Sequence, residues 1–233
     1  VRSLGWHTFG GRDAYITTGA QLTDGAPVAL RLEAAPTLRA YSLRAPEEGD
    51  DLVAAVHSSL ALLDAEPASV VVPLVCAAYR APLGGAQGSL VLQAPPGSGK
   101  TSAAQRVASH FGAALGAPGA VASFDGDSAL ALEQRLAEVG EAVLVIDDVR
   151  LAGASAATRE RFDRLLRGVF NRSSAGKLRG DGSLRLRPAS RAYPIFTSES
   201  VPRGGSLLER TLVLRFEGRL SGPPQRWIGT AED

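Results

Sequence analysis

Apolar residues recur at two different spacings along the chain, and the change between them falls near residue 85. Before that point, short apolar stretches predict strands at residues 15–18, 28–32 and 38–43, each ending near a glycine or proline. Asp50 and Asp51 then open a predicted helix, and a second apolar stretch at 67–79 predicts a buried helix. The first helix is predicted from the helical spacing of Leu52, Val53, Val56, Leu60 and Leu63.

From residue 86 onward, predicted strands and helices alternate. The strands are predicted at residues 89–93, 121–124, 142–146, 192–197 and 211–216. The helices are predicted at residues 101–111, 130–139 and 156–170. This alternation is typical of an α/β layer with a mostly parallel sheet, and a glycine-rich stretch at 84–88 precedes it. We therefore expect a small β-rich, then helical, N-terminal domain at residues 1–85 and an α/β domain with flanking helices at residues 86–233.

Composition narrows the class of protein. The chain has 233 residues, of which 45% are hydrophobic and 21% charged, as in ordinary globular proteins. It lacks a run of 18 apolar residues, so we expect no membrane partner. One cysteine, Cys76, excludes an internal disulfide framework and favours a reducing, cytoplasmic compartment. The absence of methionine indicates a piece of a longer protein.

The segment after the 89–93 strand has the pattern of a phosphate-binding P-loop. A strand, a glycine-containing turn and a helix follow one another, and the turn's N–H groups can converge on phosphate oxygens. Lys100 would bridge the β- and γ-phosphates of ATP, and the Thr101 hydroxyl would hold Mg²⁺. Ala94 stands where the first glycine is expected, a position that needs compactness more than a positive φ. The predicted nucleotide-binding residues are Pro95, Pro96, Gly97, Ser98, Gly99, Lys100, Thr101 and Ser102.

Two carboxylates end the apolar strand at 142–146. Asp147 suits a direct or second-shell Mg²⁺ partner for Thr101, and Asp148 suits activation of the attacking water. Two acids at the end of a buried strand are costly without a metal or a cationic partner. The alternative is a pair of helix-capping aspartates on a surface turn.

A basic stretch at 176–188 predicts a hairpin around Asp181-Gly182. A two-residue turn would mix arginine and leucine on both faces. A three-residue loop at 180–182 pairs Lys177 with Arg185 and Leu178 with Leu184 instead. Like charges then lie opposite each other, which suits a face that binds nucleic-acid phosphate, whereas the alternative is a solvated edge hairpin. The candidate nucleic-acid-binding residues are Lys177, Arg179, Arg185 and Arg187.

Two further positions are candidates for the reaction itself. Thr197 or Ser198, at the end of the 192–197 strand, could sense the γ-phosphate or the water, although a simple turn is the alternative. Arg210, just before the last strand, could reach the γ-phosphate bound to a neighbouring copy as an arginine finger. Arg203 is the second choice, and a plain surface arginine is the alternative for both.

Taken in order, these motifs resemble the P-loop ATPase domains of primase–helicase proteins carried by phages, plasmids and integrated mobile elements. One such group is known as domain of unknown function 927 and is related to AAA+ and superfamily 3-like hexameric helicases. Asp148 stands where that family usually has glutamate, so its carboxylate is one methylene shorter. The resemblance rests on Gly5-Trp6, Ala81-Pro82-Leu83, Asp147-Asp148, Phe170-Asn171 with Gly176-Lys177-Leu178-Arg179, and Thr197-Ser198-Glu199.

This resemblance implies an ATP- and Mg²⁺-dependent motor that forms a ring, often a hexamer, with a hairpin that binds single-stranded DNA in the pore. We therefore expect a helicase part of a replication protein. Two other hypotheses stay open at this stage. One is a nucleotide-dependent loading or assembly ATPase that does not unwind DNA, and the other is a remnant that binds nucleotide without turnover.

Overall fold

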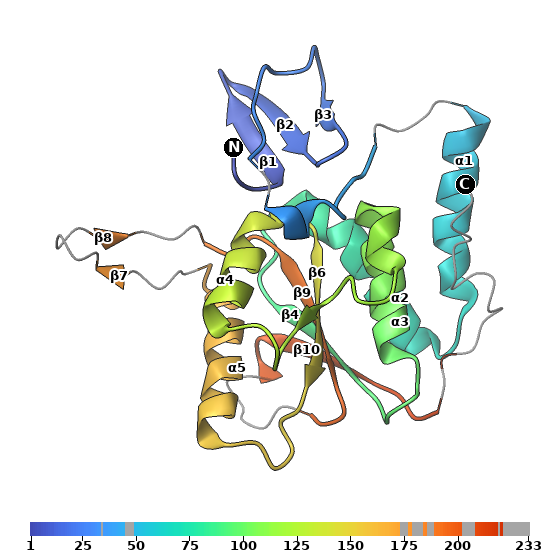
Figure 1. Cartoon of the computed structure of the whole chain (residues 1–233). Coiled ribbons are helices and arrows are strands. Elements are labelled where there is room, and N and C mark those ends of the chain that lie inside the picture. The colour runs from blue at the N-terminus through green and yellow to red at the C-terminus, as the bar shows by residue number, and fades with distance from the viewer. Residues whose placement is uncertain are drawn as a thin grey trace.

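The computed structural model describes residues 1–33, 35–44, 49–172, 177–178, 184–185, 189–201, 208–218 and 220. Its centre is a five-stranded sheet with strand order β10-β4-β9-β6-β5, in which every neighbouring pair is parallel. The predicted α/β fold with a parallel sheet is therefore confirmed (Figure 1). The strands are β4 (Ser89–Gln93), β5 (Ala122–Ser123), β6 (Val143–Val149), β9 (Tyr193–Ser198) and β10 (Thr211–Arg215).

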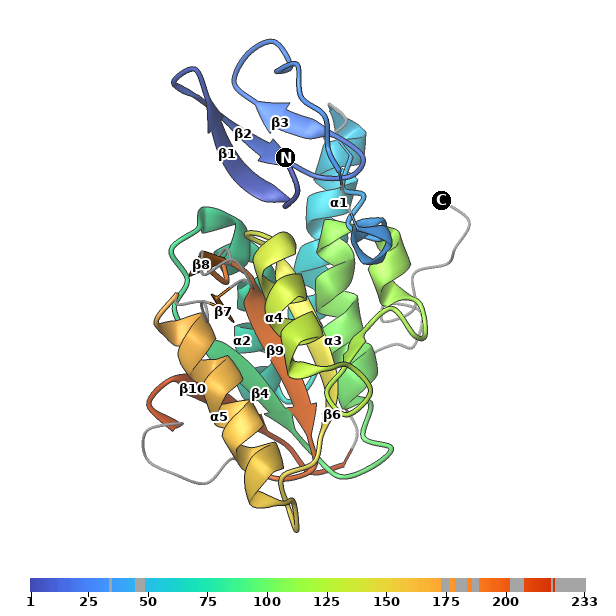
Figure 2. The same cartoon turned by 60° about the vertical axis from the view of Figure 1, so that its left-hand side comes forward.

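Helices cover both faces of this sheet (Figures 1 and 2). On one side lie α2 (Ala68–Arg80) and α3 (Lys100–Ala108), and on the other lie α4 (Ala129–Glu138) and α5 (Ala156–Phe170). Each helix buries the apolar side that its sequence period predicts, such as Phe162, Leu165, Leu166 and Val169 of α5. Short 3₁₀ turns complete the connections at Ala61–Asp64, Ala81–Leu83, Ser109–Phe111 and Ala113–Gly116.

The N-terminal residues form a separate three-stranded antiparallel sheet of β1 (Gly5–Phe9), β2 (Arg12–Ile16) and β3 (Gln21–Thr23). The strands predicted at 28–32 and 38–43 are wrong. Residues 28–33 lack a partner strand within the described part of the chain, since the Val28 N–H donates to the Gln21 side chain (3.0 Å) and the Glu33 N–H to the Val1 carbonyl (2.9 Å). Residues 36–41 turn instead, beginning with a 3₁₀ helix at Pro36–Leu38.

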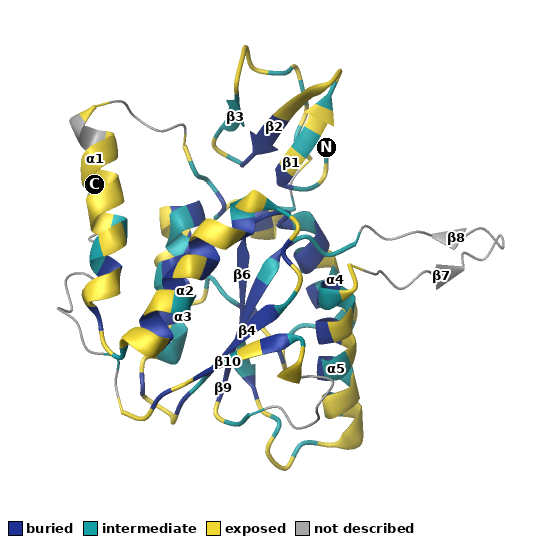
Figure 3. Cartoon of the chain, turned by 180° about the vertical axis from the view of Figure 1, so that it is seen from behind, coloured by how far each residue is buried: buried dark blue, intermediate teal, exposed yellow. Residues whose placement is uncertain are grey.

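The helix α1 (Asp50–Leu60) lies at the side of the molecule, beyond α2 and α3 (Figures 1 and 3). The sequence predicts this helix correctly, but its apolar side chains are not in the core. Leu52, Val53, Val56 and Leu60 are between 43% and 54% exposed. Helical spacing therefore identified the helix and not its packing partner.

One hydrophobic cluster joins the two parts of the chain on either side of residue 85. Leu38 and Tyr41 from the N-terminal part pack in the same cluster as α2, α3 and the sheet. The Tyr41 hydroxyl, which is buried, donates to the Val143 carbonyl at 2.9 Å. A division into two domains at residue 85 stays a prediction, because the core crosses that point.

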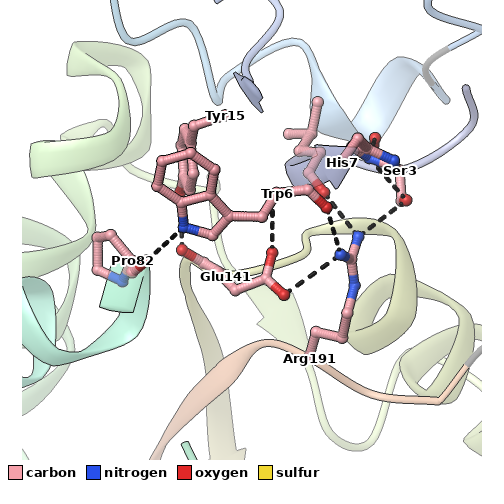
Figure 4. Close-up of polar contacts among 8 residues, drawn as sticks. Ser3, Trp6, His7, Tyr15, Pro82, Glu141 and Arg191 are labelled. Carbon is pink, nitrogen blue, oxygen red and sulfur yellow. Dashed lines mark hydrogen bonds and ion pairs between the residues drawn. The ribbon is translucent and has the colours of Figure 1, made fainter. Parts of the chain in front are cut away.

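A polar clamp fastens the N-terminal sheet to the central one (Figure 4). Arg191, just before β9, donates to the carbonyls of Trp6 and Leu4, both at 2.9 Å, and to the Ser3 hydroxyl at 3.0 Å. It also forms an ion pair with Glu141 at 3.2 Å. We call Ser3, Leu4, Trp6, Glu141 and Arg191 the clamp.

Glu141, just before β6, is the buried member of this clamp, with 8% of its side chain exposed. Its carboxylate accepts the Trp6 N–H at 2.8 Å, and its carbonyl accepts the Tyr15 hydroxyl at 2.7 Å. Burial, with Glu141 nearby, raises the pKa of Tyr15. The clamp therefore holds the amino ends of β6 and β9, the two strands whose other ends carry the candidate catalytic residues.

Candidate active site

The P-loop lies at the carboxyl end of β4 and leads directly into α3. Gly97 and Gly99 have φ values of 72° and 85°, which a residue with a side chain rarely adopts. No atom lies within 4 Å of the position that a Cβ would take at either glycine. The loop is therefore open above both glycines and leaves room for a ligand at the N-terminus of α3.

Ala94, at the first position of the loop, belongs to the core. It is fully buried, its N–H donates to the Ser198 carbonyl at 3.1 Å, and its φ is not positive. This packing explains why a small side chain replaces glycine here. Within the loop, the Lys100 ammonium donates to the Pro95 carbonyl at 3.3 Å.

Ser98 is the one residue of this loop with a buried and unpartnered side-chain oxygen among the described residues. The rest of the predicted nucleotide-binding set surrounds it in sequence. Pro95, Pro96, Gly97 and Gly99 are exposed, and Lys100 and Thr101 are half-buried at the start of α3. An unpaired buried hydroxyl is uncommon in folded proteins, and it fits a loop built to hold an anion.

Asp147, near the end of β6, links its own strand to β9 and α3. One of its carboxylate oxygens, Oδ1, accepts the Thr101 hydroxyl from α3 at 2.8 Å and also accepts the Thr197 hydroxyl from β9. Thr197 is fully buried, and its oxygen in turn accepts the Asp148 N–H at 3.1 Å. The structure thus brings together Thr101, Asp147, Asp148 and Thr197, which the sequence places far apart.

This donor set fits Mg²⁺. Magnesium in nucleotide sites is usually held by one or two protein oxygens, with phosphates and water completing the shell. Thr101 and Asp147 would supply those protein oxygens. Among the described residues no group of three or more acidic, histidine or cysteine side chains forms a metal site independent of a nucleotide.

The sequence left open whether Thr197 or Ser198 serves the site. The Ser198 hydroxyl donates to the carbonyls of Val149, at 2.5 Å, and Ser200, at 2.8 Å. It stabilises the turn after β9, whereas the Thr197 hydroxyl contacts the acidic pair. Thr197 is therefore the better candidate for sensing the nucleotide.

Asp148 has an unusual backbone. Its φ is +62°, and the ladder between β6 and β9 is irregular between Ile146 and Val149. Its carboxylate forms an ion pair with Arg150, at 3.0 Å from Nε to Oδ1 and 2.6 Å from Nη2 to Oδ2. Sequence reasoning missed Arg150, and an arginine two residues after an acidic pair at a strand end is the signal that could have found it.

Arg210 lies at the opposite edge of the sheet from the P-loop, since it precedes β10 and β10 is parallel to β4. It is half-buried, and its guanidinium lies 5.2 Å from the centre of the Phe170 ring of α5. The structure does not bring Arg210 near Lys100 or Asp148 of the same chain. Arg203 lies outside the described residues.

The basic hairpin has the second of the two predicted registers. In β7 (Lys177–Leu178) and β8 (Leu184–Arg185), Lys177 lies opposite Arg185 and Leu178 opposite Leu184. Figure 1 shows both short strands away from the central sheet, beyond α4 and α5. Arg179 and Arg187 lie outside the described residues.

A cleft of about 690 Å³ opens at the same carboxyl edge of the sheet as the P-loop. Gln93, Glu199 and Arg215 line it where β4, β9 and β10 end, and Arg159 of α5 lines its far side. Parallel sheets commonly bind ligands outside the carboxyl ends of their strands. The cleft and the P-loop therefore mark one functional edge.

Comparison with known proteins agrees with this reading of the loop and the acidic strand. Residues 90–177 match the model of the ATPase family associated with various cellular activities (AAA). No curated protein matches the chain. No helix within the described residues has both the length and the apolar character needed to span a membrane.

Two solved structures of JCV helicase are similar to the chain. One, bound to an N-(4-(2-(thiazolo[5,4-c]pyridin-2-yl)phenoxy)phenyl)acetamide ligand, has 14% identity and a TM-score of 0.41 over 73% of this chain and 47% of that chain. The other has 15% identity and a TM-score of 0.37 over 73% of this chain and 46% of that chain. The chain spans just under half the length of both. The parallel sheet, the loop and the family match together identify residues 90–177 as a P-loop ATPase domain of the AAA type.

Proposed function

We propose that the chain is a Mg²⁺-dependent ATPase motor that acts on DNA, as the helicase part of a replication protein of a phage or mobile element. The observation that carries the ATPase part is the shared oxygen of Asp147, which accepts both Thr101 and Thr197. Such a contact links the loop that would bind the phosphates to the strand that would sense them. The AAA family match supports the same reading.

Each residue of the site has one task in this proposal. Lys100 and the N–H groups of residues 95–102 bind the phosphates, and Thr101 and Asp147 hold Mg²⁺, which neutralises phosphate charge when bound. Thr197 orients the acidic pair. Asp148 accepts a proton from water while the water oxygen bonds to the γ-phosphorus and the bond to the ADP oxygen breaks, releasing ADP and phosphate.

Substitutions in the loop and the acidic pair test the ATPase part. Lys100→Ala should abolish ATP binding in a folded protein, because the loop loses its point charge toward the phosphates. Asp147→Ala should lose Mg²⁺-dependent turnover, and Asp148→Asn should bind ATP while hydrolysing it orders of magnitude more slowly. Normal turnover by folded Lys100→Ala protein would contradict the proposal.

DNA is the proposed polymer because of the hairpin register. Lys177 opposite Arg185 is destabilising for an isolated hairpin, and a bound polyanion would offset that repulsion. Replacing Arg185 and Arg187 by alanine should weaken binding of single-stranded DNA for all sequences alike and flatten the salt dependence by roughly one to two units. Arg2→Ala with Arg12→Ala, two exposed arginines on the N-terminal part, is the matched control.

The loading-ATPase hypothesis differs in its response to DNA. A motor should hydrolyse ATP faster when single-stranded DNA is added, and the hairpin double variant should lose that increase while keeping its basal rate. Equal DNA affinity of the hairpin variant and the wild type at two salt concentrations would leave the ATPase without its proposed polymer.

Assembly into a ring homo-oligomer, with a hexamer as the expected size, completes the proposal. Arg210 faces away from its own P-loop edge, so it would act on the nucleotide of a neighbouring copy. Mixing Arg210→Ala protein with Lys100→Ala protein should then restore part of the activity, because one supplies an intact P-loop and the other the arginine. Full turnover in a strictly monomeric sample would contradict a role for Arg210 in trans.

A further inference from the structure

Arg150 occupies both carboxylate oxygens of Asp148. The guanidinium approaches Oδ1 through Nε at 3.0 Å and Oδ2 through Nη2 at 2.6 Å. This two-point geometry is the arrangement in which arginine binds a carboxylate best. The side chains are 67% and 41% exposed, so the pair lies at the surface of the site and can open.

The backbone of Asp148 is fixed while its side chain is turned to Arg150. The Asp148 N–H donates to Thr197, and the residue has a φ of +62° in the irregular part of the β6–β9 ladder. The hydroxyls of Thr101 and Thr197 both donate to Asp147. The structure therefore separates the two acids: Asp147 contacts the loop, and Asp148 contacts Arg150.

The surroundings of Arg150 keep it charged. Asp148 is the main cause of a raised Arg150 pKa, and Asp125 and Glu199 add to it. The guanidinium is therefore a permanent cation among three carboxylates at the functional edge of the sheet.

We propose that Arg150 is a brake on Asp148, a positioning residue that holds the carboxylate in an ion pair until the pair opens for catalysis. This inference rests on the proposed ATPase function and concerns the regulation of the same site. A carboxylate that shares both oxygens with a guanidinium has a lower affinity for a proton, so it accepts the proton of water poorly. Opening the pair restores its basicity.

The size of the effect follows from the exposure of the pair. Exposed ion pairs favour their closed state over the open one by roughly 1.4- to 5-fold at room temperature. Removing the guanidinium should raise the basal kcat by up to about the same factor. Arg150→Lys, which keeps the charge but not the two-point contact, should fall between the wild type and Arg150→Gln.

The experiment combines the nucleotide-free protein with the enzyme. Unfolding equilibria of the wild type, Arg150→Gln, Asp148→Asn and the double variant are measured without nucleotide, and kcat and KM for ATP are measured for the wild type, Arg150→Gln and Arg150→Lys. The matched control is Arg167→Gln, which removes an exposed pair with Asp163 on α5 (2.8 Å) far along the helix from the site. We expect Arg150→Gln to raise the unfolding constant up to about fivefold in the wild-type background only.

The two measurements separate the possible failures. An unchanged or lower kcat in Arg150→Gln overturns the brake, and a lower kcat would mean that Arg150 holds Asp148 in its working position. Equal effects of Arg150→Gln in the wild-type background and in the Asp148→Asn background show that no pair forms in solution, which also overturns it. If the wild type has no turnover, the proposed ATPase function fails instead, and the nucleotide-free measurement still reports on the pair.

Discussion

Removing Arg191 should destabilise the protein far more than removing an exposed arginine. Arg191→Ala leaves the Glu141 carboxylate, which is 8% exposed, without its cationic partner, and it deprives the Leu4 and Trp6 carbonyls of a donor. Breaking a buried ion pair from one side costs about 3–5 kcal/mol. Because Arg191 is 28% exposed and Glu141 keeps the Trp6 N–H, we expect a loss of about 2–4 kcal/mol.

Thermal unfolding of the purified chain measures this loss. For a protein of this length each kcal/mol lowers Tm by roughly 2–4 °C, so Tm should fall by at least about 4 °C. The matched control is Arg2→Ala, which removes an exposed pair with Glu33 on the same N-terminal segment and should cost about 0–1 kcal/mol.

A double variant tests the cause. Glu141→Gln combined with Arg191→Met removes both charges, so it should be more stable than Arg191→Ala, which strands one of them. If Arg191→Ala is no more destabilising than Arg2→Ala, the clamp does not hold the two sheets together as described.

Three other predictions follow from the same structure. Gly140→Ala should cost about 2–4 kcal/mol in a denaturant titration, because its Cβ would lie 2.1 Å from the Leu4 carbonyl oxygen at a φ of +67°, whereas Gly119→Ala, with a φ of +81° and open space, should cost only about 1 kcal/mol. Thr197→Val should lower kcat about 10–100-fold in a steady-state ATPase assay while nucleotide affinity changes little, and an unchanged kcat would remove Thr197 from the site. Burial lowers the pKa of His110 from its usual 6.5, so stability should be complete above about pH 6.5 and fall as the pH drops through the folded-state pKa; His110→Gln should flatten that fall in unfolding curves measured between pH 7 and 5.

Local pattern was enough for the central sheet and for the P-loop. The bounds Ser89–Gln93 and Ala156–Phe170 are those that the sequence predicts, since an apolar run before a glycine turn and a stripe at helical period both determine their elements locally. The hairpin register also followed from the alternation of charge and leucine. Strand propensity failed at residues 28–32, because a strand needs a partner and none of the described strands runs beside it.

Contacts between distant residues were the part that the sequence could not predict. Glu141 and Arg191 are 50 residues apart, and no spacing rule links them before the sheet order is known. The Arg150–Asp148 pair depends on a positive φ at Asp148, which aspartate adopts only occasionally. Both are contacts that the folded backbone creates.

The close approach of Gly5 and Gly140 suggests a way to recognise other chains built on this plan. A Cβ at Gly5 would lie 2.6 Å from the Glu141 backbone nitrogen, and one at Gly140 would meet the Leu4 carbonyl, so neither position tolerates a side chain. A sequence search that requires both glycines, an acid directly after the second and an arginine ahead of the strand that ends in threonine asks for four residues with one spatial cause. Such a signature could identify chains with the same docked N-terminal sheet where overall sequence identity is too low to reveal them.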